Sequence, residues 1–93
     1  MKQQTALITG ANTGLGFEMA RTLATRGVHV VVAGRNQDKV KAAIEKISTS
    51  IKDASLEAGI IDLNSLASVQ EFATDFSKHH QQLDILINNA GIM

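Results

Sequence analysis

The 93-residue chain contains no cysteine, proline, tyrosine or tryptophan, and its only aromatic residues are three phenylalanines. The lack of cysteine excludes a disulfide framework, a thiolate metal site and a redox thiol. The lack of proline favours uninterrupted helices and strands with short connections. No apolar run approaches the roughly eighteen residues of a membrane span, and no signal or transit pattern opens the chain. The sequence therefore predicts a soluble, cytoplasmic protein without a membrane span.

The charged residues are balanced, because nine Lys and Arg face nine Asp and Glu and the formal net charge is zero. A nucleic-acid-binding domain of this size is expected to carry a basic face or a row of stacking aromatics. Neither is present, so nucleic acid is excluded as an expected partner. The length allows one domain at most.

Apolar periodicity predicts four strands that alternate with three helices. The strands are short apolar runs over residues 5–9, 28–33, 56–61 and 83–87. The first helix ends at Gly27, the second is capped by Asn36 and runs to about Thr49, and the third is capped by Asn64. Their expected buried stripes are Leu15, Met19 and Leu23; Val40, Ala43, Ile44 and Ile47; and Leu66, Val69, Phe72, Ala73 and Phe76.

This alternation is typical of an α/β fold with an open, doubly wound parallel sheet and right-handed crossovers. We predict a β-α-β-α-β-α-β unit with strand order 3-2-1-4. Helices one and two should cover one face of the sheet, and helix three part of the other. The ligand crevice is expected at the carboxyl ends of strands 1 and 4, where the strand order reverses.

A glycine-rich segment, Thr9–Gly16, joins the first strand to the first helix. Glycine at such a turn permits a tight bend, lets the backbone approach a pyrophosphate, and allows close helix-to-strand packing. Backbone amides at the helix start can then bind the anion. The segment indicates a dinucleotide site, and its alternative is an ordinary glycine-rich loop.

Three motifs at three strand ends resemble those of the short-chain dehydrogenase/reductase family. The chain matches T-G-x-x-x-G-x-G at Thr9–Gly16, N-N-A-G at Asn88–Gly91, and the Asp after the third strand at Asp62. The resemblance covers the whole chain, which is similar to the N-terminal, cofactor-binding Rossmann half of such an enzyme. The residues of its first two motifs are similar to those of the retinol-dehydrogenase and protochlorophyllide-reductase branch.

The resemblance implies a set of cofactor-binding residues. Those expected at the phosphates and adjoining ribose are Gly10, Asn12, Thr13, Gly14, Leu15 and Gly16; those at adenine are Asp62 and Leu63; those at the adenosine ribose are Asn88, Ala90 and Gly91. Two alternatives stay open. Asp62 is also a favoured turn residue, and Asn88 can tie the end of the fourth strand to its neighbour.

Arg35 at the end of the second strand indicates the choice of cofactor. An Asp or Glu there takes the ribose 2′-hydroxyl of NAD, whereas a nearby Arg accommodates the 2′-phosphate of NADP. The segment Gly34-Arg35-Asn36 has no carboxylate before Asp38. We therefore expect NADP(H) in preference to NAD, and the alternative is a solvated arginine without a ligand.

No catalytic residue is predicted in the chain. The resemblance implies a Tyr followed four residues later by Lys as the proton donor, and the chain has no tyrosine. We expect residues 1–93 to be a dinucleotide-binding half-domain without the catalytic half. The parent protein would then transfer hydride between nicotinamide and a small carbonyl or alcohol substrate. The alternative is a stand-alone, non-catalytic nucleotide-binding or self-associating module.

No metal site is predicted either, since adjacent His79 and His80 point in different directions and no third ligand is recognisable nearby. His29 is interpreted as a packed or edge histidine. The last expectation is self-association, because Ile85, Leu86 and Ile87 would lie on an open strand-4 edge beside only one charge, Asp84.

Overall fold

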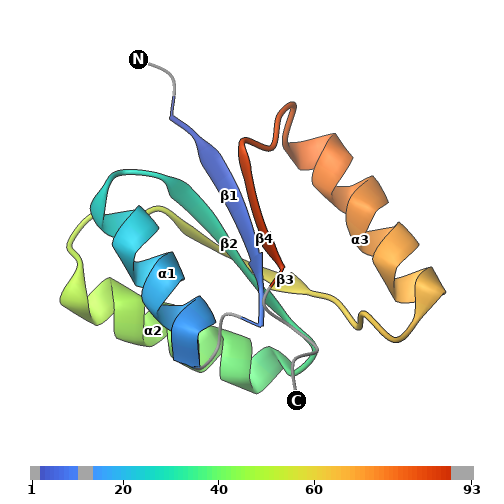
Figure 1. The fold of residues 1–93 in the computed structure, drawn as a ribbon, viewed down its shortest axis with the longest axis horizontal. Helices are drawn as coiled ribbons and strands as arrows, with labels where there is room; N and C mark the ends of the chain where they lie inside the picture. Colours follow the sequence, from blue (N-terminus) through green and yellow to red (C-terminus); the bar gives the residue numbers. More distant parts are fainter. Residues whose placement is uncertain (1–2, 11–13, 89–93) are drawn as a thin grey trace.

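The computed structural model describes residues 3–10 and 14–88, which form four strands and three helices (Figure 1). In chain order the elements are β1 Thr5–Thr9, α1 Gly14–Thr25, β2 His29–Gly34, α2 Gln37–Ser50, β3 Leu56–Ile60, α3 Leu66–His79 and β4 Ile85–Asn88. All pairings are parallel, and the strand order is β3-β2-β1-β4. The predicted α/β sheet is confirmed. None of the helices formed by these residues is long and apolar enough to cross a membrane.

The two faces of the sheet are buried to different degrees. Helices α1 and α2 lie on one face and α3 lies on the other (Figure 1). The buried core of the first face comprises Ala6, Ile8, Ala20, Ala24, Val28, Val30, Val32, Val40, Ala43 and Ile47. The smaller hydrophobic cluster of the second face comprises the buried Leu7, Val31, Ala33 and Ile61, which pack against partly buried residues of α3. No residue of α3, which is described throughout, is itself buried.

The helix ends follow from local hydrogen bonds. The Asn36 side chain accepts a bond from the Lys39 amide at 3.1 Å, and Gly27, with φ 82°, follows α1 in the left-handed region, so both predicted ends are confirmed. The prediction of Asn64 as the α3 cap is wrong. Ser65 caps α3 by accepting from the Ser68 amide at 3.2 Å, because the preceding residues are occupied by a turn.

Three residues of the predicted buried stripes are exposed. Leu15 and Leu66 are 68% and 73% exposed, because each lies in the first turn of its helix, and Ala73 is also exposed. The fourth strand begins at Ile85, so Leu83, at 38% exposed, lies before it. The intervening Asp84 is held by β1, since its amide donates to the Thr5 carbonyl at 3.0 Å.

Gly59 of β3 gives a first stability prediction. A Cβ at this position would lie 2.7 Å from Cε1 of Phe72 and 3.2 Å from Cγ1 of Val31. Relief of the first contact requires movement of the Phe72 ring, which is packed against the sheet. We expect Gly59→Ala to lower the free energy of unfolding by about 1–3 kcal/mol, although alanine normally strengthens a strand relative to glycine. Urea denaturation measures the change.

Phe72→Leu supplies the control for this prediction. The shorter side chain leaves room for the methyl group, so Gly59→Ala should cost less in the Phe72→Leu background than in the unmodified chain. Equal costs in the two backgrounds would show that the Phe72 contact is not the cause.

Candidate functional site

The described ends of the glycine-rich turn have the backbone geometry that glycine permits. Gly10 and Gly14 have φ values of 66° and 62°, in the left-handed region that favours glycine. The Gly10 amide donates to the Ala33 carbonyl at 3.0 Å, so the turn leaves β1 beside the end of β2. Asn12 and Thr13 lie outside the described residues.

The start of α1 places two further predicted residues. Gly16 is buried within α1, which agrees with a position where the helix approaches the sheet closely. Leu15, in the same turn, projects into solvent. Among the described residues, apart from the chain neighbours of Gly14 and the backbone of its own helix, no heavy atom lies within 4 Å of the position that a Cβ on Gly14 would take. The geometry therefore fits a backbone surface that a phosphate group can approach, as at other helix N-termini.

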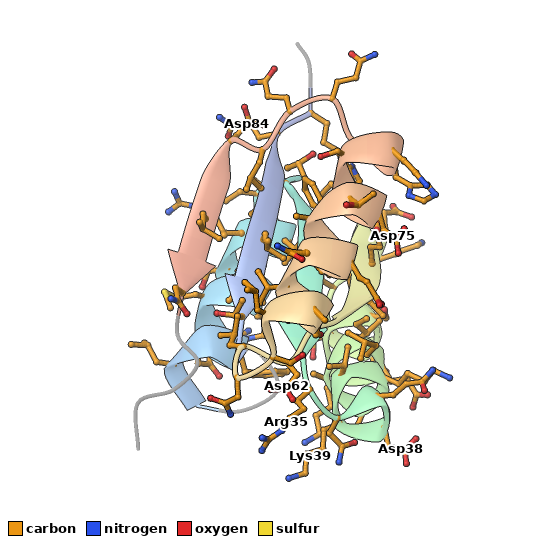
Figure 2. The ribbon with its side chains drawn as sticks, turned by 90° about the vertical axis from the view of Figure 1, so that its right-hand side faces the viewer. Arg35, Asp38, Lys39, Asp62, Asp75 and Asp84 are labelled. Carbon is orange, nitrogen blue, oxygen red and sulfur yellow. The ribbon has the colours of Figure 1, made fainter. Side chains whose placement is uncertain are left out.

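Arg35 lies at the carboxyl end of β2, between the strand and the cap of α2. Its side chain is exposed, and it shares this end of the molecule with Lys39 and Asp62 (Figure 2). Asp38, the acidic residue of the first turn of α2, is already within the helix. Arg35 thus places a guanidinium at the strand end, where a nearby Arg can accommodate a 2′-phosphate.

Asp62 follows β3 on the neighbouring strand end. The Ile61 amide donates to the Gly34 carbonyl at 2.9 Å, which fixes Asp62 close to the end of β2. Its Oδ1 accepts from the Asn64 amide at 3.0 Å, and its own amide donates to Ser68 Oγ at 2.9 Å. Asp62 therefore has the turn role foreseen as its alternative. Leu63 beside it is 43% exposed.

Asn88 is tied to β1, as its alternative role foresaw. The Thr9 hydroxyl donates to Asn88 Oδ1 at 2.9 Å, and these two residues are partners in the β1–β4 register. Thr9 is buried while Asn88 is exposed. The bond joins the two strand ends that flank the predicted crevice. Ala90 and Gly91 lie outside the described residues.

The described site residues thus share one edge of the sheet. Gly10, Arg35, Asp62 and Asn88 follow or end β1, β2, β3 and β4, and parallel strands bring these carboxyl ends together. The sheet order changes direction between β1 and β4, where open parallel sheets bind ligands. The arrangement provides backbone amides, one guanidinium and one carboxylate. That their side chains contact a cofactor stays a prediction.

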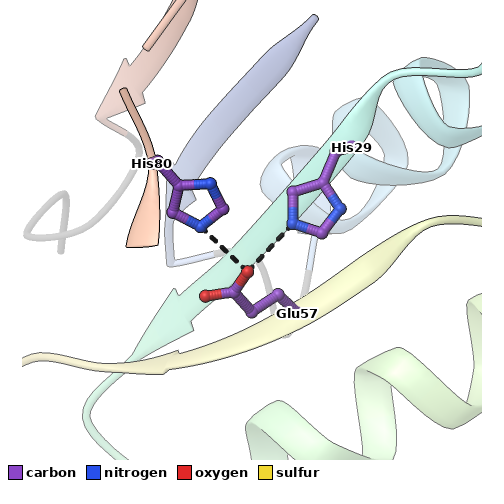
Figure 3. A group of neighbouring side chains, drawn as sticks. All are labelled: His29, Glu57 and His80. Carbon is purple, nitrogen blue, oxygen red and sulfur yellow. Dashed lines mark hydrogen bonds and ion pairs between the residues drawn. The ribbon is translucent and has the colours of Figure 1, made fainter. Parts of the chain in front are cut away.

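A second group of polar side chains lies at the amino ends of the strands and was missed by sequence reasoning. His29, Glu57 and His80 meet there, and both imidazoles bond the same carboxylate oxygen (Figure 3). Burial raises the pKa of Glu57, but hydrogen bonds and charge interactions with His29 and His80 outweigh it and leave that pKa below its ordinary value. The expectation of no metal site rested on the premise that no third ligand lies near His79 and His80, and this premise is wrong for His80.

Known relatives of the chain are oxidoreductases by name. The sequence profile described as short chain dehydrogenase matches residues 4–93. Human retinol dehydrogenase 13 is 41% identical over 90 residues, which cover 97% of this chain and 27% of that protein. The chloroplastic short-chain dehydrogenase TIC 32 A of Brassica napus is 41% identical over 92 residues, covering 99% and 29%. The chain therefore spans less than a third of these relatives.

Solved structures agree with the sequence comparison. Menthone neomenthol reductase from Mentha piperita superimposes with a TM-score of 0.92 at 30% identity, covering 99% of this chain and 33% of its own. A metagenomic short-chain oxidoreductase, solved in complex with NADP, has a TM-score of 0.87 at 34% identity and coverages of 96% and 39%. With the profile match over nearly its whole length, the chain belongs to the short-chain dehydrogenase family of oxidoreductases.

Proposed function

We propose that this chain is the NADP(H)-binding part of an oxidoreductase that acts on a carbonyl or alcohol substrate. The observation that carries the proposal is the position of Arg35, exposed at the end of β2 and beside the strand end that leads to Asp62. The left-handed glycines at the start of α1 support it, because they leave backbone accessible to a pyrophosphate. Similar structures bound to NADP or NADPH also support it.

In this proposal each group at the strand ends has a separate task. Gly10, Gly14 and the first amides of α1 bind the phosphates, while Arg35 binds the 2′-phosphate and Asp62 with Leu63 borders adenine. Asn88 accepts a hydrogen bond from the Thr9 hydroxyl and so keeps the ends of β1 and β4 together beside the predicted crevice. The bound nicotinamide supplies or accepts the hydride. The chain contains no tyrosine, so we propose that it binds the cofactor without turning over a substrate, and binding is the property to measure.

Calorimetric titration with NADPH and NADH tests the proposal. We expect tighter binding of NADPH, because Arg35 can make charge-assisted hydrogen bonds to the 2′-phosphate. Such bonds contribute roughly 1.5–3 kcal/mol, which corresponds to about 10-fold to 100-fold in Kd. Arg35→Asp should abolish or reverse the preference for NADPH.

Arg26→Asp is the matched control, since Arg26 is also exposed but lies after α1, before the amino end of β2. It makes the same change of charge at the other end of the sheet and should keep the preference. Equal affinities for the two cofactors in the unmodified chain at low salt would contradict the assignment. So would an equal loss of NADPH affinity in both variants.

We further propose that two copies of the chain associate through β4. Its residues pair with β1 on one side, and no described strand lies on the other. Leu86 is 62% exposed there. Asp84, the charge expected to protect this edge, instead turns its carboxylate to the Thr5 amide at 2.8 Å. An apolar edge without an outward charge favours strand pairing between molecules.

A further inference from the structure

The side chains of His29, Glu57 and His80 come from three elements that meet at the amino ends of the strands. His29 opens β2, Glu57 is the second residue of β3, and His80 ends α3. In the parallel register Glu57 is the partner of Val31, two residues beyond His29, so His29 and Glu57 share the face that α3 covers. Phe76, one turn before His80, packs on the His80 ring with centroids 4.5 Å apart.

The three side chains converge on a small volume. Nε2 of His29 lies 2.9 Å from Oε1 of Glu57, and Nε2 of His80 lies 3.0 Å from the same oxygen. One potential ligand atom from each residue falls within 4.8 Å of the others. Figure 3 shows both rings directed at this oxygen. Two imidazole nitrogens and one carboxylate oxygen from three elements are therefore close enough to become ligands of one cation.

The donor set is one that zinc prefers. Two imidazole nitrogens and one carboxylate oxygen are the protein ligands of a three-ligand zinc site, in which water takes the fourth position. Bonds of about 2.0–2.2 Å place tetrahedral ligand atoms roughly 3.3–3.5 Å apart. The two nitrogen-to-oxygen distances here are a few tenths of an ångström shorter. A cation enters when the two imidazoles turn from the carboxylate oxygen toward a shared position, because both rings bond that oxygen in the metal-free arrangement.

A further hydrogen bond orients one ligand. Nδ1 of His29 lies 2.6 Å from Oγ of Ser55. When Nε2 coordinates a cation, the proton of the neutral ring sits on Nδ1 and is donated to Ser55. Outer partners of this kind fix the tautomer and the direction of metal-binding histidines.

The cluster of His29, Glu57 and His80 is partly buried but accessible to solvent. The side chains of His29 and His80 are 19% and 15% exposed, whereas that of Glu57 is 41% exposed. A hollow of about 240 Å³ between the start of β1 and residues 79–82 borders His80. A hydrated cation can thus approach from solvent and exchange water for the three side chains.

We propose that His29, Glu57 and His80 bind one Zn²⁺ ion at the amino ends of the strands, at the opposite end of the sheet from the proposed nucleotide site. The ion would join the end of α3 to β2 and β3. Binding replaces the two imidazole-to-carboxylate hydrogen bonds by three coordinate bonds, and any proton on Nε2 is released or moves to Nδ1.

Calorimetric titration of the untagged chain with zinc chloride tests the proposal, and we expect one equivalent to bind. Removal of an outer partner typically costs 10-fold to 100-fold in affinity, so we expect about that loss for Ser55→Ala. Losses above about 100-fold are expected for His80→Ala and Glu57→Gln. His79→Ala is the matched control, because His79 is exposed and its Nδ1 lies 2.8 Å from the Asp75 carbonyl of its own helix.

Two further measurements keep the test decisive if His80→Ala does not fold. Glu57→Gln keeps the shape of the side chain and removes only the charge, and its folding is checked by circular dichroism. Co²⁺ added to the unmodified chain should give the intense visible absorption of a tetrahedral site. The proposal is overturned by a lack of saturable one-to-one zinc binding, by an octahedral Co²⁺ spectrum, or by an equal loss of affinity in His79→Ala.

Discussion

Ile47→Ala is expected to remove a large fraction of the free energy of unfolding. Ile47 lies on α2 with none of its surface exposed and packs in the core beneath α1 and α2. Truncation of a buried isoleucine to alanine costs about 2–5 kcal/mol, because transfer energy is lost and a cavity remains. Domains are typically stable by only about 5–15 kcal/mol. Urea denaturation followed by circular dichroism measures the loss.

Ile60→Ala makes the same substitution at an exposed position. Ile60 is on β3 and 46% exposed, so less apolar surface is lost and solvent fills the space. We expect a cost below about 1 kcal/mol. Equal costs for the two variants would mean that the burial of Ile47 does not determine its contribution to stability.

Leu86→Lys is expected to convert an associating chain into a monomer. The side chain pairs in register with Leu7 but lies beyond the cover of α3 and is 62% exposed. Lysine on an edge strand opposes pairing between molecules, since two copies would bring like charges together. Sedimentation velocity over a range of concentrations should show dimers or larger species for the unmodified chain and monomers for the variant.

Leu66→Lys provides the comparison, because Leu66 is even more exposed, at 73%, but lies on α3 away from the edge. Its substitution adds the same charge and should leave association unchanged. A stable monomer of the unmodified chain at high concentration would refute association through β4. Equal dissociation by the two lysines would indicate a nonspecific effect of charge.

The fold was largely predictable from the sequence because its signals are local. The β-branched run ending at Gly34 indicates a strand covered on both faces, and Asn36 and Gly27 set helix ends through bonds within a few residues. The predictions failed where tertiary packing determines whether a side chain is buried. Leu66 fits the helical period, but it is the first residue of α3 and is 73% exposed.

The proposed nucleotide site could be predicted from the sequence, whereas the cluster of His29, Glu57 and His80 could not. Residues such as Arg35 and Asp62 follow strands directly, so the topology alone brings them to one edge. By contrast, 28 residues separate His29 from Glu57 and 23 separate Glu57 from His80. Their meeting depends on the parallel register and on where α3 ends, and no local pattern contains that information. The alternation of residues along paired strands was the only available signal.

The shallow packing of α3 has a consequence for local unfolding. A helix without a buried residue is held mainly by the partly buried Val69, Phe72 and Phe76, so it can detach while β1 and β2 stay paired. Such segments open at lower free energy than the core and expose their amides to hydrogen exchange first. Because His80 is the C-cap of this helix, a cation bound there would hold the end of α3 to β2 and β3. It would therefore slow hydrogen exchange in α3 more than in the sheet.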